Sequence, residues 1–309
     1  MGAAVSTMTM LRAGALVIGL LAVAGPGGVV GRAAQLFRAG VVTVPVTVTV
    51  TDSAGRLVEG LQRDDFEIFE DGDPQAITQF TGERVPVSLG ILLDNSDSMR
   101  GRPVVDARTA LDRFVSELLA PGDEAFVATF NHATRLAAFW TRPPTELSGL
   151  LDTLVPSGGT AMYDALHDVA PLFERRTHVR SALVVISDGS DTASDHSVGE
   201  TRAAIQRADA FVYAIAIDAD DARASTRVSP EALREITTPS GGYTEVIRAS
   251  SELAAATERI AQELNAQYTL AYNSPKPADG QWRSIRVRLR NPELLARARR
   301  GYLALPQDR

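Results

Sequence analysis

Two aspartates, two serines and a threonine stand in segments of this chain where their oxygen atoms would suit a metal ion. They are Asp94, Ser96, Ser98, Thr160 and Asp188. Carboxylate and hydroxyl oxygens are ligands that hard cations such as Mg²⁺ prefer. Because hydroxyls are neutral, they would coordinate the ion without cancelling its positive charge. An ion held in this way would still attract an acidic group from a partner.

The sequence around these residues predicts that they meet at one edge of a sheet. Asp94 and Asp188 each end a short apolar run that is typical of a buried strand. Thr160 follows Gly158 and Gly159 and opens a helical run, and the glycines let the backbone approach closely. Ligand sites of open α/β sheets lie at the carboxyl ends of the strands. We therefore expect three loops to gather there.

Apolar runs alternate with helical patterns between residues 85 and 265, which predicts an α/β domain with a doubly wound, mostly parallel sheet and helices on both faces. Ser197 with Glu200 forms a capping box, and Ser229 before Pro230 is typical of a helix start. The expected strands are 87–94, 125–130, 135–140, 181–187, 211–217 and 243–247, and the expected helices are 102–119, 144–154, 160–175, 197–208, 229–237 and 250–265.

The segments on either side of this domain are rich in strand patterns. Val and Thr alternate from 41 to 50, and a second strand at 66–70 ends in a hairpin-type turn, after which 76–80 is expected to pair back. Alternating patterns return near the other end of the chain. We predict that 41–84 and 267–305 meet as one smaller, β-sandwich-like domain, with the α/β domain inserted between them.

The first 34 residues predict export. Arg12 precedes an apolar core from Ala13 to Ala24, which is short for a membrane span of about 20 residues. A signal peptide cut near Ala33 or Ala34 fits this pattern, and an uncleaved N-terminal anchor is the alternative. Either would give a periplasmic, secreted or cell-envelope protein. The chain has no cysteine, so disulfides are excluded.

Charge and motif content exclude several functions. A formal charge of -7 argues against nucleic acid as a partner, since phosphate binding needs basic patches. The four histidines lack the HExxH spacing of zinc hydrolases, and the G-x-S-x-G and P-loop motifs are missing. A phosphatase with an aspartate nucleophile would need a second acid where Ser96 stands. We therefore do not expect an enzyme, and a metal-dependent hydrolase is the weakest alternative.

The three polar segments, in this order and on these elements, resemble the metal-ion-dependent adhesion site of von Willebrand factor A-type domains. The resemblance spans about residues 85 to 265. The flanks resemble a bacterial family of exported proteins related to these domains. The residues that carry this second resemblance are Asp64-Asp65-Phe66-Glu67-Ile68, Asp279-Gly280-Gln281-Trp282-Arg283 and Arg300-Gly301-Tyr302.

The resemblance implies a module that binds Mg²⁺, or Mn²⁺ or Ca²⁺, and through it a Glu or Asp of a protein partner. Ser96, Ser98 and Thr160 would be direct or near-direct ligands, and Asp94 and Asp188 would bind directly or through water. Tyr163 and His132 are candidates for the partner surface because they flank the expected site. Two readings compete with this one: the hydroxyls only cap a turn, or the protein is an envelope scaffold whose binding needs no metal.

Overall fold

The computed structural model describes residues 42–188, 190–218 and 229–305. These residues all belong to one unit of the chain, 39–309. The predicted signal peptide or anchor at 1–34 lies outside the described residues. No helix within the described ranges is long and apolar enough to cross a membrane.

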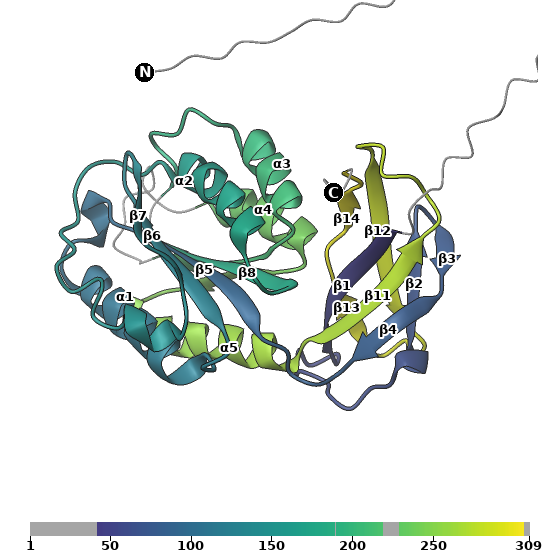
Figure 1. The fold of residues 1–309 in the computed structure, drawn as a ribbon. Coiled ribbons are helices and arrows are strands. Elements are labelled where there is room, and N and C mark those ends of the chain that lie inside the picture. The colour runs from purple at the N-terminus through teal and green to yellow at the C-terminus, as the bar shows by residue number, and fades with distance from the viewer. Residues whose placement is uncertain (1–41, 189, 219–228, 306–309) are drawn as a thin grey trace, which may run out of the picture. The chain divides into compact units, whose positions relative to one another are not determined.

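A six-stranded sheet carries the α/β part of the chain, as the alternating pattern predicts (Figure 1). Its order is β10-β9-β8-β5-β6-β7, and only the edge strand β7 runs antiparallel to its neighbour. The central strands are buried along their whole length because helices cover both faces. The strands are β5 (Val87–Asp94), β6 (Glu124–Phe130), β7 (Thr134–Thr141), β8 (Arg180–Ser187), β9 (Phe211–Ile217) and β10 (Thr244–Ile247).

Five α-helices in the described residues pack on this sheet, and they form two separate cores. Helices α1 (Arg102–Arg113) and α5 (Leu253–Ala266) bury their apolar stripes against one face of the sheet. Helices α2 (Met162–Val169), α3 (Val198–Ala208) and α4 (Pro230–Ser240) cover the other face (Figure 1). Both cores draw on β5, whose side chains alternate between the two faces, as in any strand buried on both sides.

Gly90, in the middle of β5, shows how tightly the second core is packed. A Cβ atom at this position would come within 2.5 Å of the Phe126 ring. The ring of Phe126 in turn makes edge contacts with Trp140 and Phe173, with centroid distances of 4.8 and 5.6 Å. The glycine therefore makes room for an aromatic cluster that fixes β6 against β5.

The two flanks of the chain form two four-stranded sheets. Their orders are β13-β1-β11-β4 and β14-β12-β2-β3, so each sheet combines strands from both flanks. Val, Phe, Tyr and Ile side chains from the two sheets make one shared core, as in a β-sandwich. The strands are β1 (Val42–Thr51), β2 (Phe66–Glu70), β3 (Asp73–Gln75), β4 (Ile77–Thr81), β11 (Tyr268–Ser274), β12 (Trp282–Leu289), β13 (Leu295–Arg297) and β14 (Gly301–Leu303).

A buried polar network joins the sandwich to the α/β part. Glu263, in the last turns of α5, accepts hydrogen bonds from Tyr213 on β9 at 2.8 Å and from Thr49 on β1 at 3.0 Å. Its second oxygen accepts from the guanidinium of Arg297 on β13. Gln267, just after α5, donates to Tyr213 at 3.1 Å. This network links strands of the sandwich to one helix and one strand of the α/β part.

The structure corrects several of the expected elements. The helix predicted at 144–154 is wrong: a 3₁₀ turn at Pro144–Leu147 is followed by turns, because Gly149 adopts a φ of 72° that interrupts a right-handed helix. The helix predicted at 102–119 ends as an α-helix at Arg113 and continues as a π-helical turn, Phe114–Leu118.

The predicted helix at 160–175 is also shorter, since α2 spans Met162–Val169 and a 3₁₀ segment follows. In the sandwich, the strand that pairs back on β2 is β3, whereas β4 joins the other sheet beside β11. Both helix starts predicted from capping signals are confirmed, since Ser197 accepts from the amide of Glu200 and Ser229 from that of Ala232.

Candidate functional site

Asp94 is the buried anchor of the candidate site. It ends β5, is fully buried, and accepts a hydrogen bond from the Ser187 hydroxyl at the end of the neighbouring strand β8. The Ser96 amide donates to its other oxygen at 2.8 Å. Burial raises the pKa of Asp94 to about 6, with a smaller contribution from the charge of Asp188, while the bonds from Ser187 and Ser96 oppose this rise.

Four of the five predicted ligands form one continuous set of contacts. The hydroxyls of Ser96 and Ser98 lie 3.0 Å apart, and Ser98 Oγ donates to Asp188 Oδ1 at 2.7 Å. Burial raises the pKa of Asp188, and the bond from Ser98 partly offsets this. The carboxyl ends of β5 and β8 therefore bring together two carboxyl groups and two hydroxyl groups from residues about 90 positions apart in sequence.

Thr160, the fifth predicted ligand, is held next to this set through backbone contacts of its loop. The Asp97 amide donates to the Gly158 carbonyl at 3.0 Å, and the Thr192 amide donates to the Thr160 carbonyl at 2.8 Å. The first contact ties the loop to the residues after β5, and the second ties it to those after β8. Thr160 itself is buried and comes just before α2. All three predicted loops thus lie at one edge of the sheet.

The chemistry of this set fits a hard cation. Its side chains offer only oxygen atoms as ligands. Ser96 is almost completely buried beside Asp94, the carboxyl group whose pKa is raised. Among the described residues, no group of three or more His, Cys, Asp or Glu side chains is placed to hold a metal. A cation at this edge would therefore depend on the hydroxyls as well as on the two carboxylates.

The two residues predicted for the partner surface flank the site. His132 is exposed, and its Nδ1 atom lies so close to Gly158 that a Cβ added there would approach it to 2.7 Å. Tyr163 stands in the first turn of α2 and is half-buried against the core on that side of the sheet. Burial is the main cause that raises the pKa of its phenol.

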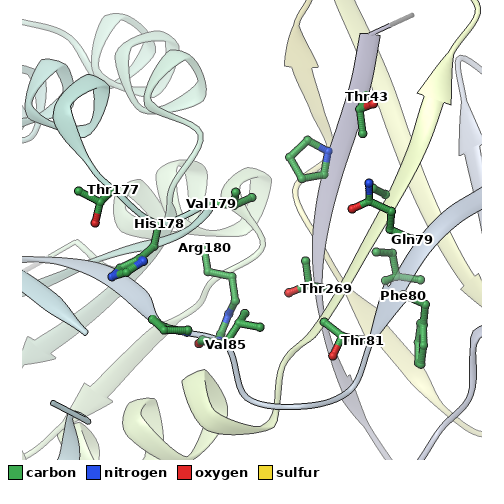
Figure 2. A pocket seen from close by; sticks show the side chains of 14 residues that line it. Thr43, Gln79, Phe80, Thr81, Val85, Thr177, His178, Val179, Arg180 and Thr269 are labelled. Atoms are coloured by element: carbon green, nitrogen blue, oxygen red, sulfur yellow. The ribbon is translucent and has the colours of Figure 1, made fainter. Parts of the chain in front are cut away.

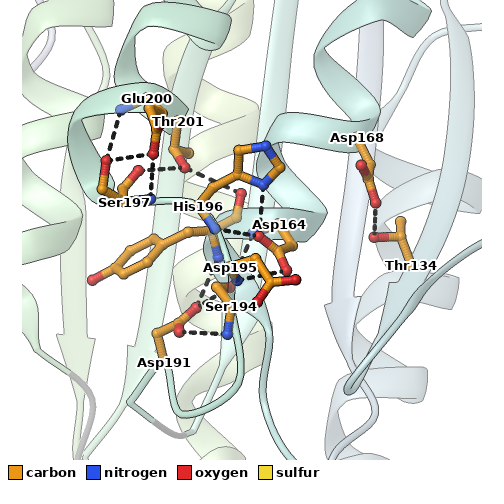
Figure 3. A network of polar contacts seen from close by, with 11 residues as sticks. Thr134, Asp164, Asp168, Asp191, Ser194, Asp195, His196, Ser197, Glu200 and Thr201 are labelled. Atoms are coloured by element: carbon orange, nitrogen blue, oxygen red, sulfur yellow. Dashed lines mark hydrogen bonds and ion pairs between the residues drawn. The ribbon is translucent and has the colours of Figure 1, made fainter.

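Sequence reasoning missed a network that fixes the loop after β8 (Figure 3). The Asp191 carboxylate accepts hydrogen bonds from the Tyr163 amide at 2.9 Å and from Ser194 Oγ at 2.6 Å. Asp164 on α2 contacts the ring of His196 at 2.7 Å. Asp191 is therefore a structural residue of this loop.

His196 completes that network by stacking on His167 of α2, with ring centroids 3.9 Å apart. The bond to Asp164 raises the pKa of His196, and His196 in turn helps to lower the pKa of Asp164. These contacts join positions roughly 30 residues apart, and nothing in the local sequence signals them. Their effect is to hold the loop after Asp188 against α2.

The fold and the edge at which these oxygens meet define the class of this α/β part. Residues 89–190 match the family model of the von Willebrand factor type A domain, and this segment contains all five predicted ligands. A comparison with curated proteins finds no match. The family match indicates a protein-interaction module, and it does not point to an enzyme.

Solved structures show the same fold. Proximal thread matrix protein 1 from the mussel byssus is similar at 16% identity with a TM-score of 0.53, over 63% of this chain and 51% of that one. A von Willebrand factor type A protein from Catenulispora acidiphila is similar at 16% identity with a TM-score of 0.50, over 84% of this chain and 72% of that one. This chain spans about half the length of the mussel protein. The α/β part therefore has the von Willebrand factor type A fold.

Proposed function

We propose that the α/β part binds a divalent cation, Mg²⁺ or else Mn²⁺ or Ca²⁺, and through it an acidic side chain of a protein partner. The ligands would be Asp94, Ser96, Ser98, Thr160 and Asp188. The observation that carries this proposal is the unbroken set of contacts from Asp94 through Ser96 and Ser98 to Asp188. A cation would supply positive charge and open coordination positions at this edge.

Neighbouring groups hold the Asp94 carboxylate in a fixed orientation for binding a cation. The Ser187 hydroxyl and the Ser96 amide each hold one of its oxygens, so its orientation is set before any ion arrives. These donors are neutral, and they leave the charge of the carboxylate uncompensated. Burial then disfavours the ionised form, as the raised pKa shows. A divalent cation would remove this penalty, which favours its binding.

Two further expectations are part of this proposal. His132 and Tyr163 would contact the partner, since one lies against the Gly158 segment and the other opens α2 beside it. The apolar core of the first 34 residues supports export, either as a secreted or periplasmic protein or as one anchored in the cell envelope. N-terminal sequencing of the protein recovered from the envelope and from the medium would distinguish cleavage from anchoring.

The metal site is tested by calorimetric titration of the full chain with MgCl₂ and with MnCl₂. We expect the double variant Ser96→Ala/Ser98→Ala to lose at least about tenfold in affinity, because two of the oxygen ligands are gone. Ser53→Ala, in an exposed turn of the sandwich, removes a hydroxyl elsewhere and should bind as the parent does. Equal metal affinity in the double variant and the parent would show that the site is wrongly assigned.

The partner is tested by pull-down from envelope extracts with and without EDTA. We expect capture that EDTA abolishes, that Mg²⁺ restores, and that the double variant lacks. A captured protein should lose binding when one exposed Glu or Asp in its contact surface is changed to Gln or Asn. Capture that survives both EDTA and the double substitution would instead favour a scaffold whose binding needs no metal.

A further inference from the structure

A cleft in the described residues lies at the opposite end of the sheet from the candidate metal site. It has a volume of about 820 Å³ and opens between the outer face of the sheet β13-β1-β11-β4 and the amino ends of β5 and β8 (Figure 2). Because β5 runs from this end to Asp94, its length separates the two sites by roughly 23 Å. The size is typical of a pocket for a small molecule.

Three buried polar atoms in the walls of this cleft have no hydrogen-bond partner among the described residues. They are Nε2 of His178, Nε of Arg180 and Oγ1 of Thr269. Figure 2 shows His178 and Arg180 on the wall made by the α/β part and Thr269 on the wall made by the sandwich. Leaving such atoms without a partner costs about 1–3 kcal/mol each, so a cluster of three points to a ligand.

Arg180 also carries a charge that its neighbours do not neutralise. It is only 2% exposed, and its two Nη groups donate to the carbonyls of Val85 and Leu264 and to Oε1 of Gln267, which are all neutral. Burial lowers the pKa of Arg180 to about 10, so it remains charged at neutral pH. A buried charge is normally paired.

The two carboxylates near the cleft, Asp123 and Glu124, already bond to other groups of the chain. Asp123 forms an ion pair with Arg84 and accepts from the Val87 amide at 2.9 Å. Glu124 accepts from Ser88 Oγ and from the Thr177 amide, both at 2.6 Å. Neither carboxylate forms an ion pair or hydrogen bond with Arg180, whose Nη groups contact only neutral acceptors. A buried guanidinium with an unpartnered Nε and no acidic partner in the described part of the chain favours an anionic ligand.

The rest of the lining sets the chemistry of that anion. Besides the polar residues, the walls consist largely of Pro, Val, Phe, Leu and Ala side chains. Both Nη groups of Arg180 already donate to the chain, whereas Nε has no partner among the described residues and can donate to an oxygen of a ligand. We propose that this cleft binds a small organic carboxylate with an apolar body, whose oxygens accept hydrogen bonds from Arg180, Thr269 and His178.

The probe for this proposal is octanoate, titrated into the full chain by calorimetry, with octanamide as a neutral molecule of the same length and acetate as the head group alone. We expect octanoate to bind at least about tenfold more tightly than octanamide, since the amide lacks the charge that Arg180 would neutralise. Acetate should bind weakly because it leaves the apolar walls uncovered. Octanoate that does not bind at millimolar concentration, or binds no better than octanamide, would overturn the proposal.

Two variants locate the site. Thr269→Val keeps the shape of the side chain but removes its hydroxyl, and His178→Gln removes the imidazole; each should weaken octanoate binding about tenfold. Thr47→Val is the matched control, because Thr47 is the register neighbour of Thr269 on β1 but does not line the cleft. Arg180→Gln should cause the largest loss and is compared only if its circular dichroism and urea midpoint match the parent. Unchanged octanoate affinity in both Thr269→Val and His178→Gln would refute the assignment.

Discussion

Two buried carboxyl groups, Asp94 and Glu263, lie in different surroundings within this molecule. Asp94 is bonded by a serine hydroxyl and a backbone amide, which carry no charge. Glu263 is bonded by two hydroxyls and by the guanidinium of Arg297, so the chain supplies its counter-charge. The first group retains an uncompensated charge at the edge of the sheet, whereas the second is neutralised where two parts of the chain join. On the proposed function, the first group serves cation binding, whereas the second ties the sandwich to the α/β part.

The largest effect is expected from Glu263→Gln. The amide can still accept from Tyr213 and Thr49, but Arg297 loses its counter-charge in a mostly buried position. We expect the free energy of unfolding to fall by about 3 kcal/mol, measured by urea denaturation. Glu258→Gln on the same helix is the control: its pair with Arg113 is about two-fifths exposed on both sides, and its loss should cost less than about 1 kcal/mol. Equal losses in the two variants would remove the basis of the comparison.

Asp94→Asn should raise the free energy of unfolding when divalent ions are removed. The folded-state pKa of about 6 exceeds the ordinary value of 3.8, so the folded chain binds the proton more tightly than the unfolded chain. In EDTA, the stability of the parent should therefore fall as the pH rises from about 4 to 6 and then level off. The variant should lack this fall and be about 2 kcal/mol more stable at pH 7.

Urea titrations of parent and variant across this pH range, with and without Mg²⁺, measure the effect. Saturating Mg²⁺ should raise the stability of the parent at pH 7 and stabilise the Asp94→Asn variant much less, because the variant keeps only one of the two carboxylate ligands and binds the cation more weakly. A variant that is destabilised in EDTA as strongly as Glu263→Gln would show that Asp94 serves the fold and not binding.

The smallest effect is expected at the contact between Asp164 and His196, which holds the loop behind the candidate metal site. The pKa of Asp164 is lowered, so its contribution to the stability of the fold is present above about pH 4 and is lost as the pH falls further. The pKa of His196 is raised, so its contribution is present below about pH 6.5 and lost as the pH rises through the folded value. The urea midpoint of the parent should decline slightly above pH 6.5, and His196→Gln should abolish that decline. A decline of the same size in the variant would assign it to another group.

The strands of the α/β part were the easiest elements to predict, because each is a short apolar run with polar residues on both sides. The strand predicted at 211–217 matches β9 at both ends, and 87–94 matches β5. Helices were less accurate where a glycine or proline interrupts the pattern, as Gly149 does. The strand β13 was missed because three residues, Leu295–Arg297, are too few to show a period.

The meeting of these oxygen-bearing residues at one edge of the sheet was predictable for a physical reason. A parallel sheet places the carboxyl ends of its strands at one edge, so an aspartate at the end of each of two strands is brought to that edge by topology. The Glu263 network had no such signal. Its members Thr49, Tyr213 and Arg297 stand on separate strands, and the residues of the Thr49 pair are 214 positions apart. Their pairing depends on how two parts of the chain pack.

Residue types and their order determined the alternation of strands and helices, the edge at which the oxygen-bearing loops gather, and the capping of at least two helices. Tertiary packing alone decided which buried carboxylate pairs with an arginine, which strands of the flanks share a sheet, and where a charged arginine faces a cleft. The difference has a simple cause. Periodicity and capping act within a few residues, whereas burial, charge compensation and cavity shape arise only when segments hundreds of residues apart are pressed together.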